Sequence, residues 1–166
     1  MELFVQQLVN GCTIGAFYAL VALGYTMVYG VLKLINFAHG DLFMWGTLVG
    51  WAFLSWVVGS IFNLGLVALL LAAILVMMVI GALGVTIERV AYRPLRRAGR
   101  LSPIISALGV AFILEAVARN VTEASYQVYP PELIPKGGFN IVGDVYLSWL
   151  QLAVFLASAL LLIGLY

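Results

Sequence analysis

The sequence has 166 residues, of which 64% are hydrophobic and only 9% are charged, and its mean hydropathy is +1.13. A soluble globular domain carries roughly 25% charged residues, so a chain this apolar cannot cover its own surface with polar groups. The formal net charge of +1 creates no strong field for nucleic acid. We therefore expect an integral membrane protein, with an all-α, polytopic transmembrane helix bundle that forms a single domain over residues 1–166.

Stretches without charged side chains predict the membrane-spanning helices in chain order. A helix crosses the hydrocarbon core in about 20 residues, and residues 3–32 form one long or tilted span. The uncharged stretch 42–87 is long enough for two spans, and Gly, Ser and Asn cluster near its middle. The predicted spans, about five in number, are 3–32, 42–61, 65–87, 101–118 and 146–166.

Basic residues between the third and fourth spans indicate the orientation. The segment 88–100 reads ERVAYRPLRRAGR, and short loops rich in arginine stay in the cytoplasm. The proline-containing segment 120–145 is then predicted to be external, and so is the N-terminus. The arginines signal topology, bind anionic lipid headgroups or contact a cytoplasmic partner, and the sequence leaves these alternatives open.

Pairs of small residues recur at helical spacing on the first two spans. Gly11 and Gly15 form one pair, and Gly46 and Gly50 form another. Such pairs let membrane helices approach closely, so we interpret all four as helix-packing positions. The face of the first span that carries Gly11 and Gly15 also carries tyrosines, and a tyrosine-lined transport path is the alternative.

Two polar sets lie inside the first and fourth spans. Gln6, Asn10 and Thr13 are expected to line a water-filled cavity or to hydrogen-bond to a neighbouring helix. Glu115 and Arg119, acid first and one helical turn apart, predict an ion pair along the helix. A charge in the hydrocarbon needs a partner or water. The pair is therefore an interfacial ion pair or a polar group in a subunit interface or pore vestibule.

The stretch INFAHGDLF, residues 35–43, joins the first two spans. It contains Asn36, His39, Gly40 and Asp41, and His39 is the only histidine in the sequence. Asp41 precedes an apolar run and is predicted to cap the second helix. Asn36 and His39 would satisfy backbone groups in a turn buried within protein near the cytoplasmic surface. We interpret these four residues as an inner joint, with a translocation path or gate as the functional alternative.

Motifs of catalysis do not occur in the sequence. There is no GxxxxGK[ST] phosphate loop, no HExxH motif and no Cys/His cluster with metal-ligand spacing. We expect no catalytic residues, no metal and no cofactor, and we expect any ATP hydrolysis to take place on other chains.

Three motifs spaced along residues 10–109 carry a family resemblance. They are the glycine-containing first span together with the INFAHGD stretch that follows it, the segment ERVAYRPLR, and the IISALG stretch that opens the fourth span. The second motif contains Glu88, Arg89, Arg93, Pro94 and Arg96. Together the three motifs resemble the branched-chain amino acid ABC transporter permeases that carry an NFAHG motif.

The resemblance implies a permease subunit of a bacterial-type inner membrane that forms a translocation path with a second, related permease subunit. It also implies two cytoplasmic ATPase subunits, an external solute-binding protein, and Leu, Ile, Val or related solutes as cargo. Members of the family continue through further spans and an ATPase-docking loop, so this chain would correspond to the N-terminal half. The joint would shape the path or its inner gate, and Arg89, Arg93 and Arg96 would lie near the partners.

Two other classes of function stay open on the residues alone. A structural membrane protein would assemble a complex through its glycine faces and transport nothing. A proton- or ion-coupled carrier would use His39, Asp41 and Glu115. Uptake that survives ATP depletion but collapses with the proton gradient would favour the carrier.

Overall fold

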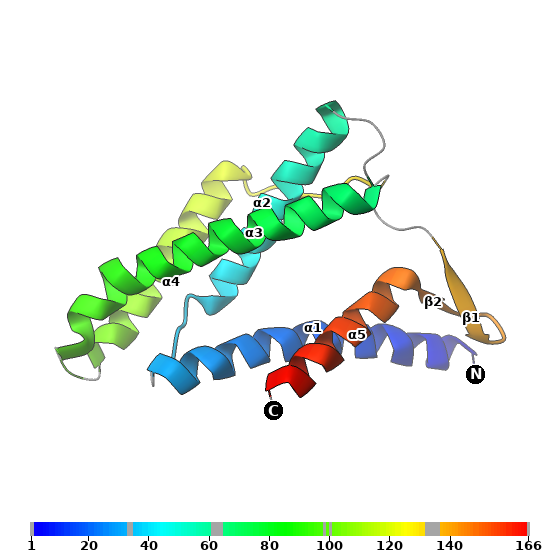
Figure 1. Ribbon diagram of the computed structural model, residues 1–166, viewed down its shortest axis with the longest axis horizontal. Coiled ribbons are helices and arrows are strands. Elements are labelled where there is room, and N and C mark those ends of the chain that lie inside the picture. Colours follow the sequence, from blue (N-terminus) through cyan, green and yellow to red (C-terminus); the bar gives the residue numbers. More distant parts are fainter. Residues whose placement is uncertain are drawn as a thin grey trace. The chain divides into compact units, whose positions relative to one another are not determined.

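The computed structural model describes residues 2–32, 35–60, 65–97, 99, 101–131 and 137–165. Within these ranges lie the helices α1 (Glu2–Leu32), α2 (His39–Ser60), α3 (Gly65–Ile87), α4 (Leu101–Val121) and α5 (Trp149–Leu165) (Figure 1). The predicted all-α class is therefore confirmed. Parts of the predicted break between the second and third spans and of segments 88–100 and 120–145 lie outside the described residues.

Three described helical stretches are long and apolar enough to cross a membrane: Glu2–Gly30, Val67–Leu95 and Leu101–Val121. A shorter apolar helix covers Trp149–Gly164. The most apolar windows of the three long stretches are only 0%, 11% and 17% buried inside the chain. Apolar surface this extensive needs lipid or other protein around it, so the chain is a membrane helix bundle. The second and fifth predicted crossings, which correspond to α2 and α5, stay predictions.

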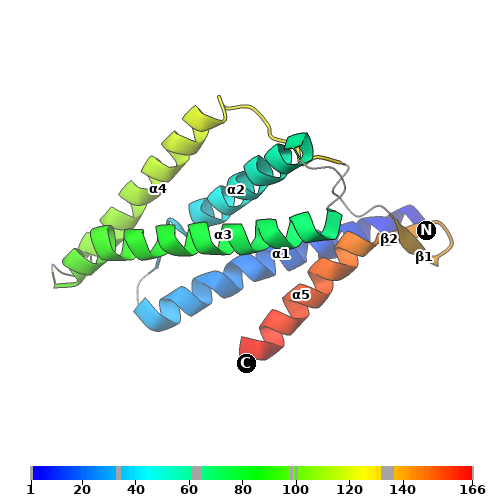
Figure 2. The ribbon, with the colours of Figure 1, turned by 45° about the horizontal axis from the view of Figure 1, so that its top comes forward.

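The chain divides into two compact units. One unit comprises Met1–Thr26 with Ile134–Tyr166, and the other comprises Met27–Leu133. In the second unit, α2 packs against both α3 and α4 (Figures 1 and 2). Its main core is a cluster of buried side chains: Ala38, Ile87, Tyr92, Ala107 and Leu114.

Helix α3 continues without a break into segment 88–97, which is helical rather than the predicted loop. A π-helical turn covers Glu88–Tyr92 and a 3-10 helix covers Arg93–Arg97. Pro94 has no N–H for a regular α-helical bond, which favours the change of helix type at this point. Ile87 and Tyr92 are both buried, and the wider π-turn brings positions five apart towards the same side.

A β-hairpin precedes α5 in the first unit and was not predicted. Strands β1 (Gly138–Val142) and β2 (Val145–Ser148) pair antiparallel. Gly143, with φ +56°, lies in the turn between them. Alternating apolar residues on both sides of a Gly-Asp dipeptide are the hairpin signal that the sequence offered.

Helix α5 begins at Trp149 rather than at the predicted residue 146 because Ser148 caps it. The Ser148 hydroxyl accepts a hydrogen bond from the Gln151 amide (3.1 Å), and the Gln151 side chain accepts one from the Ser148 amide (3.0 Å). This reciprocal pair is a capping box. It fixes the change from strand to helix within one residue.

The polar stripe of the first span hydrogen-bonds to this hairpin and to α5. The Gln6 side chain accepts a hydrogen bond from the Tyr146 amide (2.8 Å) and donates one to the Tyr146 carbonyl (3.1 Å). Gln151 donates to the Asn10 side chain (3.2 Å). Of the two expectations for this stripe, these contacts match hydrogen bonding to a neighbouring element.

Helix α4 ends in a Schellman motif built without glycine. The Ala124 amide donates to the Arg119 carbonyl (2.9 Å), and the Glu123 amide donates to the Asn120 carbonyl (3.4 Å). Glu123 and Ala124 have φ values of +52° and +54°. Residues with a Cβ atom are strained in this left-handed region.

Replacing Glu123 with glycine is expected to stabilise the chain. Glycine adopts a positive φ without strain, so we expect a gain of about 0.5–1 kcal/mol in the free energy of unfolding. The thermal midpoint of the purified protein would measure it. Glu123→Ala is the control, because alanine keeps the Cβ atom, and an equal gain in that variant would contradict backbone strain as the cause.

Candidate functional site

The joint between α1 and α2 is organised by the Asn36 side chain. Its carbonyl oxygen accepts hydrogen bonds from the Ala38 amide (3.1 Å) and from the Tyr92 hydroxyl (2.6 Å). Asn36 is 9% exposed and Ala38 is fully buried. A buried amide needs its partners close by, so Asn36 connects the joint to the π-turn that follows α3.

The prediction that Asp41 caps α2 is wrong, because the helix begins at His39. The His39 amide donates to the Asn36 carbonyl (3.1 Å), and the Leu42 amide donates to the Ala38 carbonyl (3.0 Å). The turn made by Asn36 therefore starts the helix earlier than expected. Asp41 lies in the first turn, where a negative charge is favourable beside the helix dipole.

The four predicted joint residues differ in burial. Asn36 is buried, His39 and Asp41 are partly buried, and Gly40 is exposed. The structure brings Asn36 to the core of its unit, where it contacts Tyr92 from another element. Sequence reasoning did not identify Tyr92 as its partner, although Tyr92 lies inside the ERVAYRPLR motif.

Two further hydrogen bonds connect the elements around this joint. The Trp45 indole donates to the Leu114 carbonyl (3.1 Å) and connects α2 with α4. The Ser106 hydroxyl donates to the Ala91 carbonyl (3.0 Å) and connects α4 with the π-turn. A π-turn shifts the regular backbone bonding, and such turns are frequent at functional sites. Here the Ser106 hydroxyl of α4 donates to the Ala91 carbonyl, which lies within the π-turn.

The two glycine pairs lie in different surroundings. A Cβ atom on Gly46 would contact Val76 at 3.5 Å, and one on Gly50 would contact the Tyr129 hydroxyl at 3.2 Å. Around Gly11 and Gly15, a Cβ atom would meet nothing within 4 Å in the described part of the chain. The second pair therefore packs inside its unit, and the first pair presents an uncovered face.

The predicted cytoplasmic residues lie on the π-turn and the 3-10 helix. Glu88 is partly buried, and Arg89, Arg93 and Pro94 are exposed. The side chain of Arg96 lies outside the described part of the structure. The exposed arginines are available to headgroups or a partner, and their function stays a prediction.

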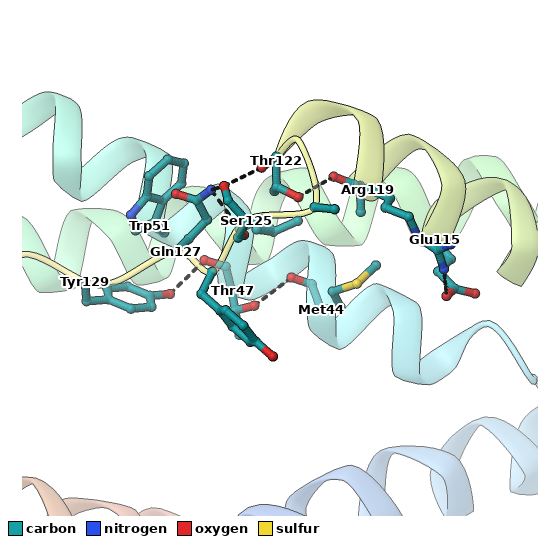
Figure 3. A pocket seen from close by; sticks show the side chains of 13 residues that line it. Met44, Thr47, Trp51, Glu115, Arg119, Thr122, Ser125, Gln127 and Tyr129 are labelled. Atoms are coloured by element: carbon teal, nitrogen blue, oxygen red, sulfur yellow. Dashed lines mark hydrogen bonds and ion pairs between the residues drawn. The ribbon is translucent and has the colours of Figure 1, made fainter.

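A pocket of about 720 Å³ lies between α2, α4 and the segment that follows α4 (Figure 3). The lining residues from the two helices are Met44, Thr47, Leu48, Trp51, Glu115, Ala118 and Arg119. Those from the following segment are Thr122, Ala124, Ser125, Tyr126, Gln127 and Tyr129. Its volume lies within the range of small-molecule sites, and it is an open hollow rather than an enclosed cavity.

Two aromatic residues hold the segment after α4 against α2. The Trp51 indole donates to the Val128 carbonyl (3.0 Å), and the Tyr129 hydroxyl donates to the Thr47 carbonyl (2.7 Å). Burial raises the pKa of Tyr129 above its usual value, so the hydroxyl keeps its proton, and this hydrogen bond, to a higher pH than an ordinary tyrosine would. No local sequence signal predicts these contacts, because Tyr129 and Thr47 lie 82 positions apart.

The predicted pair of Glu115 and Arg119 forms an ion pair on α4 (Figure 3). Both side chains line the 720 Å³ pocket, and both also line a second hollow of about 410 Å³. Within the part of the chain that the structure describes, no group of three or more His, Cys, Asp or Glu residues is arranged to hold a metal ion. The site therefore offers opposite charges and an apolar wall.

The long, apolar and little-buried helices define a polytopic membrane protein. The chain belongs to the family described as branched-chain amino acid transport system / permease component, whose model matches residues 7–166. This membership confirms the resemblance inferred from the three sequence motifs. No solved structure matches the chain significantly.

Three curated relatives illustrate the similarity. The high-affinity branched-chain amino acid transport system permease protein BraD of Pseudomonas aeruginosa is 40% identical over 98% of this chain and 53% of its own length. LivH proteins, described in the same words, are 42% identical in Salmonella typhimurium over 85% of this chain, and 40% identical in Escherichia coli over 78%. These matches cover 45% and 42% of the LivH lengths. The chain therefore spans about half the length of the curated relatives it matches.

Proposed function

We propose that this chain is part of a permease subunit of an ABC importer for branched-chain amino acids (Leu, Ile, Val) or related solutes. The observation that carries the proposal is the match of residues 7–166 to the permease family. The importer would lie in a bacterial-type inner membrane. It would include a second permease subunit, two cytoplasmic ATPase subunits and an external solute-binding protein.

The joint supports such a function by making one packed unit from several elements. Hydrogen bonds from Tyr92 to Asn36, from Trp45 to Leu114 and from Ser106 to Ala91 connect α2, α4 and the π-turn. Alternating access needs packed helices that move as bodies. In this proposal the joint keeps the inner ends of the helices together, and Arg89 and Arg93 face the cytoplasmic partners.

The uncovered face at Gly11 and Gly15 supports assembly with other transmembrane helices. A Cβ atom at either position would meet nothing within 4 Å in the described part of the chain. Small residues of this spacing let a neighbouring helix approach closely. We propose that the neighbour belongs to the second permease subunit or to the remainder of this one.

A proton-coupled carrier that uses Glu115 is less well supported than the importer. The Glu115 carboxylate already forms an ion pair with Arg119 on the same helix. The family whose model matches residues 7–166 is described as the permease component of a branched-chain amino acid transport system.

Uptake of labelled L-leucine by the complete system tests the proposal. The full-length permease, the second permease, the ATPases and the binding protein would be reconstituted in proteoliposomes with ATP enclosed. We expect uptake that stops when the phosphate-loop lysine of the ATPase is replaced by alanine and that continues with a protonophore. ATP-independent uptake abolished by the protonophore would contradict the importer. ATP hydrolysis without leucine uptake would contradict transport of this cargo.

A further inference from the structure

The only charged side chains among the 13 that line the larger pocket are Glu115 and Arg119 (Figure 3). The two side chains are 48% and 65% exposed within the chain. They project from α4, a helix apolar enough to cross a membrane. An ion pair left in hydrocarbon costs several kcal/mol or more. This face of α4 is therefore expected to meet water, a polar ligand or other protein.

Most neutral polar side chains of the pocket wall already donate hydrogen bonds within the chain. The hydroxyls of Thr47 and Thr122 donate to carbonyls one turn back (2.7 and 2.9 Å). The Trp51 indole and the Tyr129 hydroxyl donate to backbone carbonyls, as described above. A ligand would therefore find two opposite charges and the exposed Tyr126 beside an apolar wall that includes Met44, Leu48 and Trp51.

We propose that this pocket binds the zwitterionic head of an α-amino acid, with its apolar side chain against Met44, Leu48 and Trp51. The Arg119 guanidinium would receive the α-carboxylate, because its planar fork of donors fits a carboxylate bidentately. The Glu115 carboxylate would receive the α-ammonium group. The inference rests on the proposed function and specifies one site on the path of the cargo.

Electrostatic balance favours a zwitterion over ligands with a single charge. When the pair opens around a zwitterion, each of the four charges acquires an opposite partner, and none is left uncompensated. A ligand with only a carboxylate would leave Glu115 beside a second negative charge, and an amine would leave Arg119 unpaired. Like charges at such short range repel, and an unpaired charge loses the attraction that the ion pair supplied.

Binding of labelled L-leucine to the purified complete importer, without its binding protein, tests the proposal. Arg119→Gln is expected to weaken binding at least about tenfold, the effect of one charge-assisted hydrogen bond. In the unmodified importer, L-leucine is expected to compete better than leucinamide or 4-methylpentanoate, which each lack one charge of the zwitterion. Glu123→Gln, which removes a charge near the end of α4 but outside the pocket lining, is expected to bind as the unmodified importer does.

The charge-swapped variant, Glu115→Arg with Arg119→Glu, separates a ligand role from a structural one. It keeps an ion pair on α4, so we expect normal assembly, but the zwitterion would bind reversed with its side chain away from the apolar wall. Restored leucine binding in this variant would overturn the proposal, and so would unchanged binding in Arg119→Gln. Those results would leave the proposed function standing if the unmodified importer transports leucine. An importer that hydrolyses ATP without leucine uptake would overturn both.

Discussion

Replacing Asn36 with alanine is expected to lower the free energy of unfolding by about 2–4 kcal/mol, since two buried donors lose their acceptor. The Ala38 amide and the Tyr92 hydroxyl both donate to the Asn36 side chain. Both donors belong to buried residues, since Ala38 is fully buried and Tyr92 is 5% exposed. Heat or SDS unfolding of the purified permease in detergent would measure the loss.

Tyr92→Phe separates the two hydrogen bonds at Asn36. Phenylalanine removes one donor and keeps the ring in the core, so we expect a loss of about 1 kcal/mol. In the Asn36→Ala background, Tyr92→Phe removes a hydroxyl that has lost its acceptor. We therefore expect it to leave the free energy of unfolding unchanged or to raise it. The double-mutant cycle therefore gives a coupling energy between the two positions. Additive losses would contradict a direct bond between these side chains.

An exposed asparagine provides the control for this prediction. Asn120 is exposed on α4, and Asn120→Ala is expected to change the free energy of unfolding by less than about 0.5 kcal/mol. Equal losses of unfolding free energy in Asn36→Ala and Asn120→Ala would mean that the buried hydrogen bonds of Asn36 do not stabilise the chain. A full folded yield of Asn36→Ala with abolished transport would instead assign this residue to the path.

Much of the helical architecture could be predicted because lipid imposes a strong rule on the sequence. Backbone groups in hydrocarbon must bond within a helix, so uncharged stretches give helices. Helix α3 covers Gly65–Ile87, the range predicted for the third span. The bounds differ where side chains hydrogen-bond to the backbone, as Asn36 does before α2 and Ser148 does before α5.

The contacts that build the site could not be predicted, because they join residues far apart in the sequence. Asn36 and Tyr92 are 56 positions apart, and Trp51 and Val128 are 77 apart. The hydropathy of a sequence does not indicate which distant residues contact each other. The pairing of Glu115 with Arg119 could be predicted from the sequence because the two residues lie one helical turn apart. The pocket beside this pair could not be predicted, because it forms only when α2 and the segment after α4 pack against α4.

Leucine at both Gly11 and Gly15 is expected to leave the folding of this chain unchanged and to disrupt its assembly. A Cβ atom at either position meets nothing within 4 Å in the described part of the chain. If a helix of the second permease subunit packs there, two leucine side chains separate the helices, and close packing is lost. We expect co-purification of the second permease to fall at least about tenfold, which corresponds to a loss of about 1.4 kcal/mol.

Leucine at both Gly46 and Gly50 is the matched comparison. Here we expect the folding of this chain to be impaired, rather than its assembly with the second permease. Their Cβ atoms would lie 3.5 Å from Val76 and 3.2 Å from the Tyr129 hydroxyl. Larger side chains would overpack this contact and destabilise the chain itself by about 1–3 kcal/mol. Loss of folded chain with Gly11→Leu and Gly15→Leu would mean that this face packs within the same polypeptide. Normal assembly in that variant would mean that the glycine face is not an interface, because a close helix contact cannot accommodate two leucine side chains in place of hydrogen atoms.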